Sequence, residues 1–338
     1  MGQNVELRTG VKLGVVPTHL RFVGGLVPDE NGRIPRDDSG RLKAVANLAK
    51  LAEASRVPIT CAQIPYFPGL NDDDVAEMVG GIRDLGMEVL FIMMVGGADP
   101  MNPADEDAVV GMLTAGLEAA KKNGVAHVAS TSIEAWMAGG VPKEGAAYDA
   151  AVAQNVKLHV RACKEAGVVG SCIKHWHIEF LRSIEFQTFT SIARAQPVIA
   201  GCNEALGTKL FKLLVDAAHC GDGELSIAEN VALIAKLGAA DELGVFHASA
   251  KTTRGCLTTD DGWIGALLAA AAATGKLEHV FVELFHHEDA ALEALRDAVP
   301  GHGVDTTDGR TYDETVIDGV YEVGRRLNNL VARGILND

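Results

Sequence analysis

The stretch KHWHIEFLRSIE, residues 174–185, alternates ionisable and apolar side chains and then turns over. If residues 174–180 are extended, successive side chains point to opposite faces of a strand. His175, His177 and Glu179 then share one face, and the aromatic and aliphatic residues between them share the other. An ordinary core strand does not carry three ionisable groups on one face, so we predict that this strand borders a functional site.

The composition indicates a globular α/β protein. The chain has 338 residues, of which 48% are hydrophobic and only 5% aromatic, and its formal charge is −15. This balance suits helices packed on buried parallel strands. The acidic charge argues against a nucleic-acid partner, which requires clustered Lys and Arg. No apolar run is long enough to span a bilayer. Six scattered cysteines and no signal sequence favour a cytoplasmic protein with reduced thiols.

Short apolar runs alternate with longer segments of helical periodicity. The predicted strands are residues 11–17, 57–64, 87–95, 125–131, a strand within 168–180, 209–215, 244–248 and 279–285. The predicted helices are residues 41–54, 72–85, 105–122, 148–166, a segment beginning at 226, 263–273 and 290–299. Eight such units in one direction predict a single (β/α)8 TIM barrel domain over residues 1–338. A doubly wound open sheet fits less well, because no glycine-rich phosphate turn follows the first strand.

Two segments lie outside this alternation. Residues 21–40 form a polar loop rich in Gly, Pro and Asp, which is either an active-site loop insertion at the catalytic end of the barrel or a surface insert. Residues 313–335 carry apolar side chains at helical spacing and predict an extra C-terminal helix. That helix would pack on the outside of the barrel or against another subunit.

The ends of the last four predicted strands carry the candidate site. Glu179, Asp216, His247 and Glu283 each end an apolar strand, and their separations of 37, 31 and 36 residues are one βα unit each. Barrel active sites lie at this end of the strands. Any one of these residues alone more often caps a helix or pairs with Lys or Arg. Three converging carboxylates, however, would repel one another without a cation. Three carboxylates and one imidazole favour Mn²⁺ (or Mg²⁺ or Co²⁺) over a sulfur-rich zinc or iron centre.

These residues resemble those of the xylose-isomerase-like TIM barrels, and within them the ketose 3-epimerases of the tagatose/allulose type. The resembling segments cover about the second half of the chain: residues 179–185, Asp216-Ala217-Ala218-His219, the segment from His247 through Arg254 to Trp263, and Val282-Glu283. Three features depart from the family pattern. Arg254 is one place further from His247 than usual, the chain is longer than typical ketose epimerases, and its first half has no clear epimerase signature.

The resemblance implies a reaction and a set of roles. The metal ion would be held by Glu179, Asp216, His247 and Glu283. The sugar would be contacted by Glu185, His219 and Arg254. His177 either fills the barrel interior or contacts the substrate. The implied reaction is a metal-dependent isomerisation or epimerisation of a keto sugar or sugar derivative through an enediolate, with Glu179 and Glu283 as the acid/base groups.

Three other functions stay open. A metal-dependent lyase of the same superfamily, resembling an inosose dehydratase or an enzyme that cleaves 3-oxo-glycosides or C-glycosides, would form the same enediolate and then expel a leaving group. An apurinic endonuclease resembling endonuclease IV would need further ligands and a basic surface. A non-catalytic sugar-binding barrel would not need all four strand-end ligands. We expect a homo-oligomer, and a small second subunit is compatible with the lyase alternative.

Overall fold

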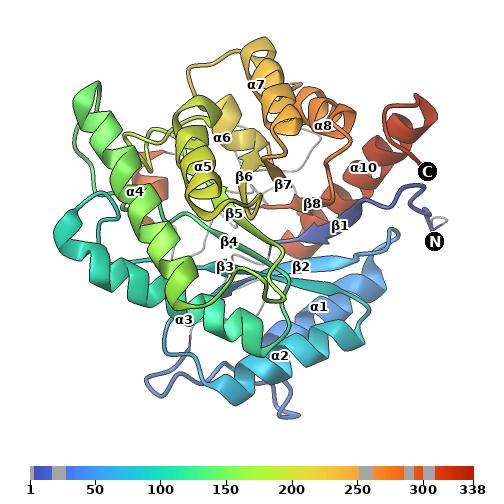
Figure 1. Ribbon diagram of the computed structural model, residues 1–338. Helices are drawn as coiled ribbons and strands as arrows, with labels where there is room; N and C mark the ends of the chain where they lie inside the picture. The colour runs from blue at the N-terminus through green and yellow to red at the C-terminus, as the bar shows by residue number, and fades with distance from the viewer. Residues whose placement is uncertain (1–3, 17–27, 251–261, 285–292, 300–308) are drawn as a thin grey trace.

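A computed structural model describes residues 4–16, 28–250, 262–284, 293–299 and 309–338. Its centre is a closed barrel of eight parallel strands in the order β1 to β8, with the helices around it (Figure 1). The strands are β1 (Lys12–Val15), β2 (Cys61–Tyr66), β3 (Glu88–Met93), β4 (His127–Ser130), β5 (His175–Glu179), β6 (Phe211–Asp216), β7 (Leu243–Ala248) and β8 (His279–Val282). The predicted (β/α)8 TIM barrel is confirmed. That the whole chain is one domain stays a prediction.

Several helices begin after a residue whose side chain caps them. They are α1 (Lys43–Ala54), α2 (Asp72–Asp84), η1 (Pro103–Asp105), α3 (Glu106–Lys122), α4 (Ala146–Glu165), α5 (Ile192–Leu206), α6 (Ala217–Gly221), α7 (Ile227–Ala239), α8 (Trp263–Ala273), α9 (Glu293–Ala298) and α10 (Tyr312–Ala332). Ser226 and Thr311 each form a capping box with a glutamate three residues later. In the described ranges, no helix combines the length and the apolar character needed to cross a membrane.

The sequence pattern is incomplete between the fifth and sixth strands. It predicts no helix there, whereas the structure has α5, which begins after the N-cap Ser191 and contains Pro197. That proline interrupts the helical signal, although the helix continues through it. The structure also adds α6, a five-residue helix capped by Asp216. His219 therefore lies on a short helix and not in an irregular loop.

The extra C-terminal helix is confirmed as α10, which packs on the outside of the barrel beside β1 and β8 (Figure 1). Gly319 allows this close approach, because a Cβ atom at that position would lie 2.9 Å from Val282 Cγ1. The buried face of the helix includes Val316, Val320 and Val323. The sequence predicts that this helix packs either on the barrel or against another subunit, and in the structure it packs on the barrel.

The barrel interior has an apolar middle. Residues two apart on a strand share a face, so the register of the strands identifies the side chains that point inward. One buried apolar cluster is separate from the large core between barrel and helices, and consists of Val16, Cys61, Leu90, Ile92, Ala129, Leu214, Val245 and Phe281. Gly14 lies in register with Cys61 and Phe281, and a Cβ atom there would be 2.3 Å from the Cys61 carbonyl oxygen. The middle of the barrel is therefore filled.

Both ends of the interior are polar. We call the carboxyl end of the strands the mouth and the opposite end the base. The mouth carries Gln63, Glu179, Asp216, His247 and Glu283, and the base carries Lys12, Glu88, His127, His175, His177, Lys212 and His279. Strand β5 contributes to both, with His175 and Glu179 four residues and about 13 Å apart. The predicted common face of His175, His177 and Glu179 is confirmed, since Trp176 and Ile178 belong to the outer core.

The described part of the predicted insertion, residues 28–40, is anchored at the rim of the mouth. Asp74, in the first turn of α2, is fully buried and accepts hydrogen bonds from Arg33 (2.7 and 2.8 Å), Arg36 (2.7 Å) and the Ile34 backbone N–H (2.9 Å). These charge-assisted bonds fix the loop on the helix. Residues 21–27 of the same loop lie outside the described residues.

Candidate metal centre

The four predicted ligands converge at the mouth. Glu179 and Asp216 are the last residues of β5 and β6, His247 is the fifth residue of β7, and Glu283 directly follows β8. One ligand atom from each residue lies within 4.8 Å of the others, and all four side chains are buried. The convergence follows from the closed barrel, because successive parallel strands bring their carboxyl ends to one opening.

The imidazole of His247 is at the centre of this group. Its Nδ1 atom lies 3.3 Å from Glu283 Oε2, 3.7 Å from Glu179 Oε1 and 3.8 Å from Asp216 Oδ2. Burial lowers the pKa of His247, but the three carboxylates outweigh burial and raise its pKa to about 9. The protein alone thus attracts a positive charge to this point.

Gln63 on β2 fixes the orientation of that imidazole. Gln63 Oε1 lies 2.7 Å from His247 Nε2, and both side chains are buried. With the amide oxygen in this position, Nε2 carries the ring proton and donates it, so neutral His247 turns the lone pair of Nδ1 toward the carboxylates. Ligand histidines in metalloproteins are typically held by such a partner on the other ring nitrogen.

The donor set fits a divalent ion. Within the described part of the chain, His247 Nδ1 is buried and makes no hydrogen bond, although three carboxylates surround it. An ion with oxygen-rich coordination would bind the carboxylates and this nitrogen together and remove their mutual repulsion. Without thiolates, the set suits Mn²⁺, Mg²⁺ or Co²⁺ better than it suits a sulfur-rich zinc or iron centre.

Two of the predicted substrate contacts lie directly beside the four ligands. His219 Nε2 is 3.5 Å from Glu179 Oε1, and His219 Nδ1 is 3.9 Å from Glu185 Oε2. The backbone N–H of His219 donates to Asp216 Oδ1 at 2.9 Å, because Asp216 caps helix α6. The ring of His219 therefore joins the ligand group to Glu185.

Glu185 is positioned by two residues that the sequence analysis did not single out. Trp136 Nε1–H donates to Glu185 Oε1 at 3.0 Å, and Arg182 Nε–H donates to Glu185 Oε2 at 3.0 Å. Arg182 also binds Asp222 at 2.8 Å. Trp136 is 44% exposed, so it offers an aromatic surface next to the site. An exposed tryptophan at a strand–helix loop is the signal that could have indicated it.

The loop that carries Glu185 is fixed by a buried carboxylate, Glu134. Its two oxygens accept hydrogen bonds of 2.8–3.1 Å from the backbone N–H groups of Gln187, Thr188 and Phe189. Glu134 lies 53 residues before Gln187. Nothing in the local sequence indicates this partnership, because Glu134 follows β4 in an irregular segment.

The remaining predicted contacts have a different outcome. His177 lies one alternation below Glu179 and is directed toward the base: its Nε2 is 3.4 Å from His127 Nδ1, and its Nδ1 accepts from the Val245 N–H at 3.3 Å. The structure does not bring His177 together with the four ligands. Arg254 lies outside the described residues.

Solved structures of sugar-converting enzymes share this fold. L-ribulose 3-epimerase has a TM-score of 0.71 and 16% identity over 96% of this chain and 97% of its own. D-allulose 3-epimerase from Methylomonas sp., in complex with D-allulose, has a TM-score of 0.69 and 16% identity over 96% of this chain and 100% of its own. A protein described as a sugar phosphate isomerase/epimerase from Anabaena variabilis has a TM-score of 0.73 and 15% identity, covering 95% and 99%.

At this level of identity the likeness concerns the fold. The barrel has the same fold as these ketose 3-epimerases, which is the fold that the resemblance implied. The chain matches no protein-family model, and no curated protein matches it either.

Proposed function

We propose that this protein is a divalent-metal-dependent sugar isomerase or epimerase that acts on a keto sugar or sugar derivative through an enediolate. The observation that carries the proposal is the convergence of Glu179, Asp216, His247 and Glu283 at the mouth of the barrel. It is supported by the fold shared with ketose 3-epimerases, one of which is described in complex with D-allulose.

The four ligands would hold Mn²⁺, Mg²⁺ or Co²⁺, which as a Lewis acid stabilises negative charge on substrate oxygens. Glu179 ends β5 and Glu283 directly follows β8, and β6 and β7 lie between these two strands in the barrel. They therefore approach a substrate in the mouth from different sides. One carboxylate would remove the α-proton of the sugar, and the other would return a proton to the opposite face, which inverts that carbon.

Glu185 and His219 would orient hydroxyl groups of the sugar. Glu185 is preorganised by Trp136 and Arg182, and His219 is fixed by the bond from its backbone to Asp216. The exposed ring of Trp136 would cover an apolar face of the sugar. Arg254 stays in the proposal as a contact to a distal oxygen. We leave His177 out, because both of its ring nitrogens contact groups outside the mouth.

Product analysis tests the reaction type. The enzyme should be incubated with Mn²⁺ and a panel of free ketoses, ketose phosphates and 3-keto-glycosides. We expect an epimer or an isomer of at least one sugar. An unsaturated or cleaved product would instead identify the lyase predicted as the alternative, which draws no support from the structural neighbours.

Metal removal tests the centre itself. Exhaustive EDTA treatment should abolish turnover, and Mn²⁺ or Co²⁺ should restore it, because the acid/base carboxylates are also ligands. Turnover that persists after verified metal removal would exclude the proposed mechanism. Cytoplasmic location and assembly as a homo-oligomer stay predictions of the sequence; the five cysteines in the described ranges, Cys61, Cys163, Cys172, Cys202 and Cys220, are free thiols.

A further inference from the structure

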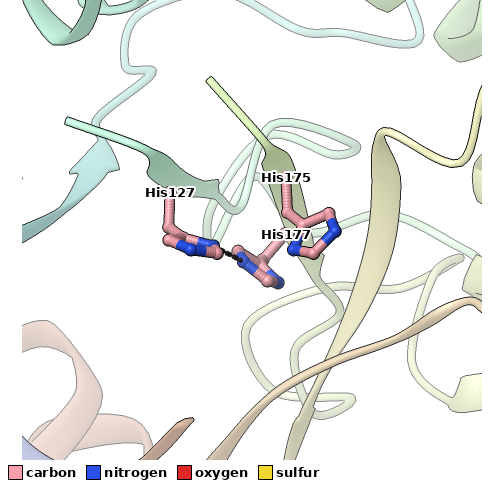
Figure 2. Close-up of side chains that lie close together, drawn as sticks. All are labelled: His127, His175 and His177. Carbon is pink, nitrogen blue, oxygen red and sulfur yellow. Dashed lines mark hydrogen bonds between the residues drawn. The ribbon is translucent and has the colours of Figure 1, made fainter. Parts of the chain in front are cut away.

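The base of the barrel holds a second group of metal-ligating side chains, which the proposed reaction does not use. His127 begins β4, and His175 and His177 lie on β5, with one nitrogen of each within 4.8 Å of the others. Figure 2 shows the rings of His127 and His177 turned toward each other, with His175 beside them. The sheet register produces this group, because His127 and His175 are direct neighbours across the two strands.

The spacing of the rings is that of ligands around one ion. His127 Nδ1 and His177 Nε2 lie 3.4 Å apart, which is longer than an ordinary hydrogen bond. Two imidazole nitrogens bonded at about 2.0–2.1 Å to a tetrahedral ion are roughly 3.3–3.4 Å apart. The ring centroid of His175 lies 5.3 Å from that of His127 and 5.8 Å from that of His177.

A carboxylate stands behind one of these rings. Glu88 Oε1 is 3.7 Å from His127 Nε2, so His127 can direct a proton toward Glu88 and turn its Nδ1 lone pair toward His177. The other oxygen of Glu88 is bound by Lys12 and, at 3.2 Å, by His279 Nε2. Because Lys12 already neutralises Glu88, this carboxylate suits the role of an outer partner that orients a ligand imidazole.

The geometry points to a second divalent-cation site, in which His127, His175 and His177 bind Zn²⁺ or a similar borderline transition-metal ion. Three imidazoles without a carboxylate ligand select such an ion over Mn²⁺ or Mg²⁺, in contrast to the mouth. Burial lowers the pKa of His127 to about 3 and also lowers the pKa of His175, so both rings are neutral ligands at pH 7.

The site has an access route and an open position. A cavity of about 350 Å³ reaches it between the strand starts, and its lining includes His175, His177, Lys212, Lys276 and Glu278. Lys276 and Glu278 are largely exposed, so the cavity communicates with solvent. Lys212, a cation in the wall, is held by Asp241 through its carbonyl oxygen at 2.6 Å and its carboxylate at 3.3 Å. A water molecule from the cavity would complete four-coordination.

Binding requires one local exchange. His177 would carry its ring proton on Nδ1, where the Val245 N–H now donates at 3.3 Å. Strand β7 is bulged at this place: Leu243 pairs with Leu213 and Phe246 with Val215, so Gly244 and Val245 together oppose the single residue Leu214 of β6. Gly244 lies in the bulge, and a Cβ atom there would be 2.7 Å from His177 Nδ1. Because the backbone is irregular here, the long hydrogen bond from the Val245 N–H to His177 Nδ1 can be lost when His177 binds an ion through Nε2.

The experiment uses the full chain, stripped of metal and titrated with Co²⁺ and Zn²⁺. Saturating Mn²⁺ first occupies the metal centre at the mouth. The double variant Asp216→Asn/Glu283→Gln provides a second way to prevent Zn²⁺ and Co²⁺ from binding there. We expect one equivalent of Zn²⁺ to bind in both preparations. Co²⁺ in the double variant should show the strong visible absorption of a four-coordinate ion, which an oxygen-rich six-coordinate site lacks.

Single substitutions test whether the bound Zn²⁺ lies at the base. His175→Gln should weaken Zn²⁺ binding at least tenfold, and this variant should fold because the His175 side chain is partly exposed (24%) and its substitution leaves the apolar core intact. Lys174→Gln, one residue earlier and exposed, is the matched control and should bind as the unsubstituted chain does. Zn²⁺ binding that disappears when the mouth is silenced, or that is unchanged in both His175→Gln and His127→Gln, would overturn the site. Neither result bears on the proposed reaction, which depends on the mouth alone.

Discussion

The mouth and the base of the barrel interior are built from the same strands but differ in chemistry. At the mouth three carboxylates surround one imidazole, whereas at the base four imidazoles, His127, His175, His177 and His279, lie together and one carboxylate, Glu88, contacts two of them, His127 and His279. The mouth therefore suits a hard cation with oxygen ligands, and the base suits a borderline cation with nitrogen ligands. The apolar cluster around Leu90, Leu214 and Phe281 separates them.

The difference follows from the two-residue period of the strands. On β5, β6 and β8 an ionisable residue at the base lies four positions before a ligand at the mouth: His175 before Glu179, Lys212 before Asp216, and His279 before Glu283. Side chains four apart on a strand point the same way. A single face can thus carry two separate sites: on β6 and β8 the residue between them is apolar, Leu214 or Phe281, whereas on β5 it is His177, which belongs to the base.

The largest expected effect is a loss of turnover in Glu283→Gln at the mouth, which we compare with Glu88→Gln at the base. Glu283→Gln should lower the turnover rate on the order of 10²–10⁴-fold, because it removes a ligand and an acid/base group at once. Deuterium incorporation from D₂O at the substrate α-carbon measures the lost proton exchange directly. Glu88→Gln, its counterpart at the base, should leave turnover within about a factor of two, since Glu88 contacts no group of the mouth among the described residues.

The same pair of variants can also contradict the distinction between the mouth and the base. Full α-proton exchange in Glu283→Gln would remove this residue from the acid/base role. An equal loss of turnover in both variants, with both folded by circular dichroism, would mean that the two ends act as one unit.

The next effect concerns the orientation of a ligand. Gln63→Met should weaken Mn²⁺ binding by about 10–100-fold, because His247 then loses the acceptor that keeps its proton on Nε2. Gln63→Glu retains an acceptor and should bind Mn²⁺ nearly as well as the unsubstituted chain. Isothermal titration with Mn²⁺ measures both affinities. Undiminished binding by Gln63→Met would show that Gln63 only fills space.

Much of this arrangement was predictable because strand signals are local. The alternation at residues 174–180 correctly separates His175, His177 and Glu179 from Trp176 and Ile178, and the spacing of the strand ends predicts the four converging ligands. The barrel then follows from eight repeated units. These features depend on neighbours in the chain, so one sequence contains them.

The partners of those residues were not predictable, because they are distant in sequence and have no pattern of their own. Gln63 lies 184 residues from His247 and is a neutral amide within an apolar strand. Trp136 reaches Glu185 from another loop. The alternation predicts that His177 points into the barrel, but it does not predict how far along the barrel axis the side chain lies. Its position toward the base is evident only from its contact with His127.

The smallest expected effect concerns the loop that borders the mouth. Burial opposes the charge of Asp74, but the hydrogen bonds from Arg33, the Ile34 N–H and Arg36 outweigh it and lower the pKa of Asp74 to about 2. The ordinary pKa of aspartate in an unfolded chain is near 3.9. A carboxylate with a depressed pKa stabilises the folded state fully above that ordinary value, and this contribution is lost as the pH falls toward 2. We expect Asp74→Asn to cost about 1–2 kcal/mol of unfolding free energy at pH 6, measured by urea denaturation.

The same measurement at pH 2.5 should show a smaller difference, because Asp74 is then partly protonated in the folded protein as well. Asp72→Asn, in the same helical turn but largely exposed and paired with Lys122 at 2.9 Å, is the control and should change stability by at most about 0.5 kcal/mol. Since residues 28–40 border the mouth and not the base, Asp74→Asn should weaken Mn²⁺ binding before it alters Zn²⁺ binding. A loss of Zn²⁺ affinity with Mn²⁺ affinity intact would show that this loop stabilises the barrel as a whole.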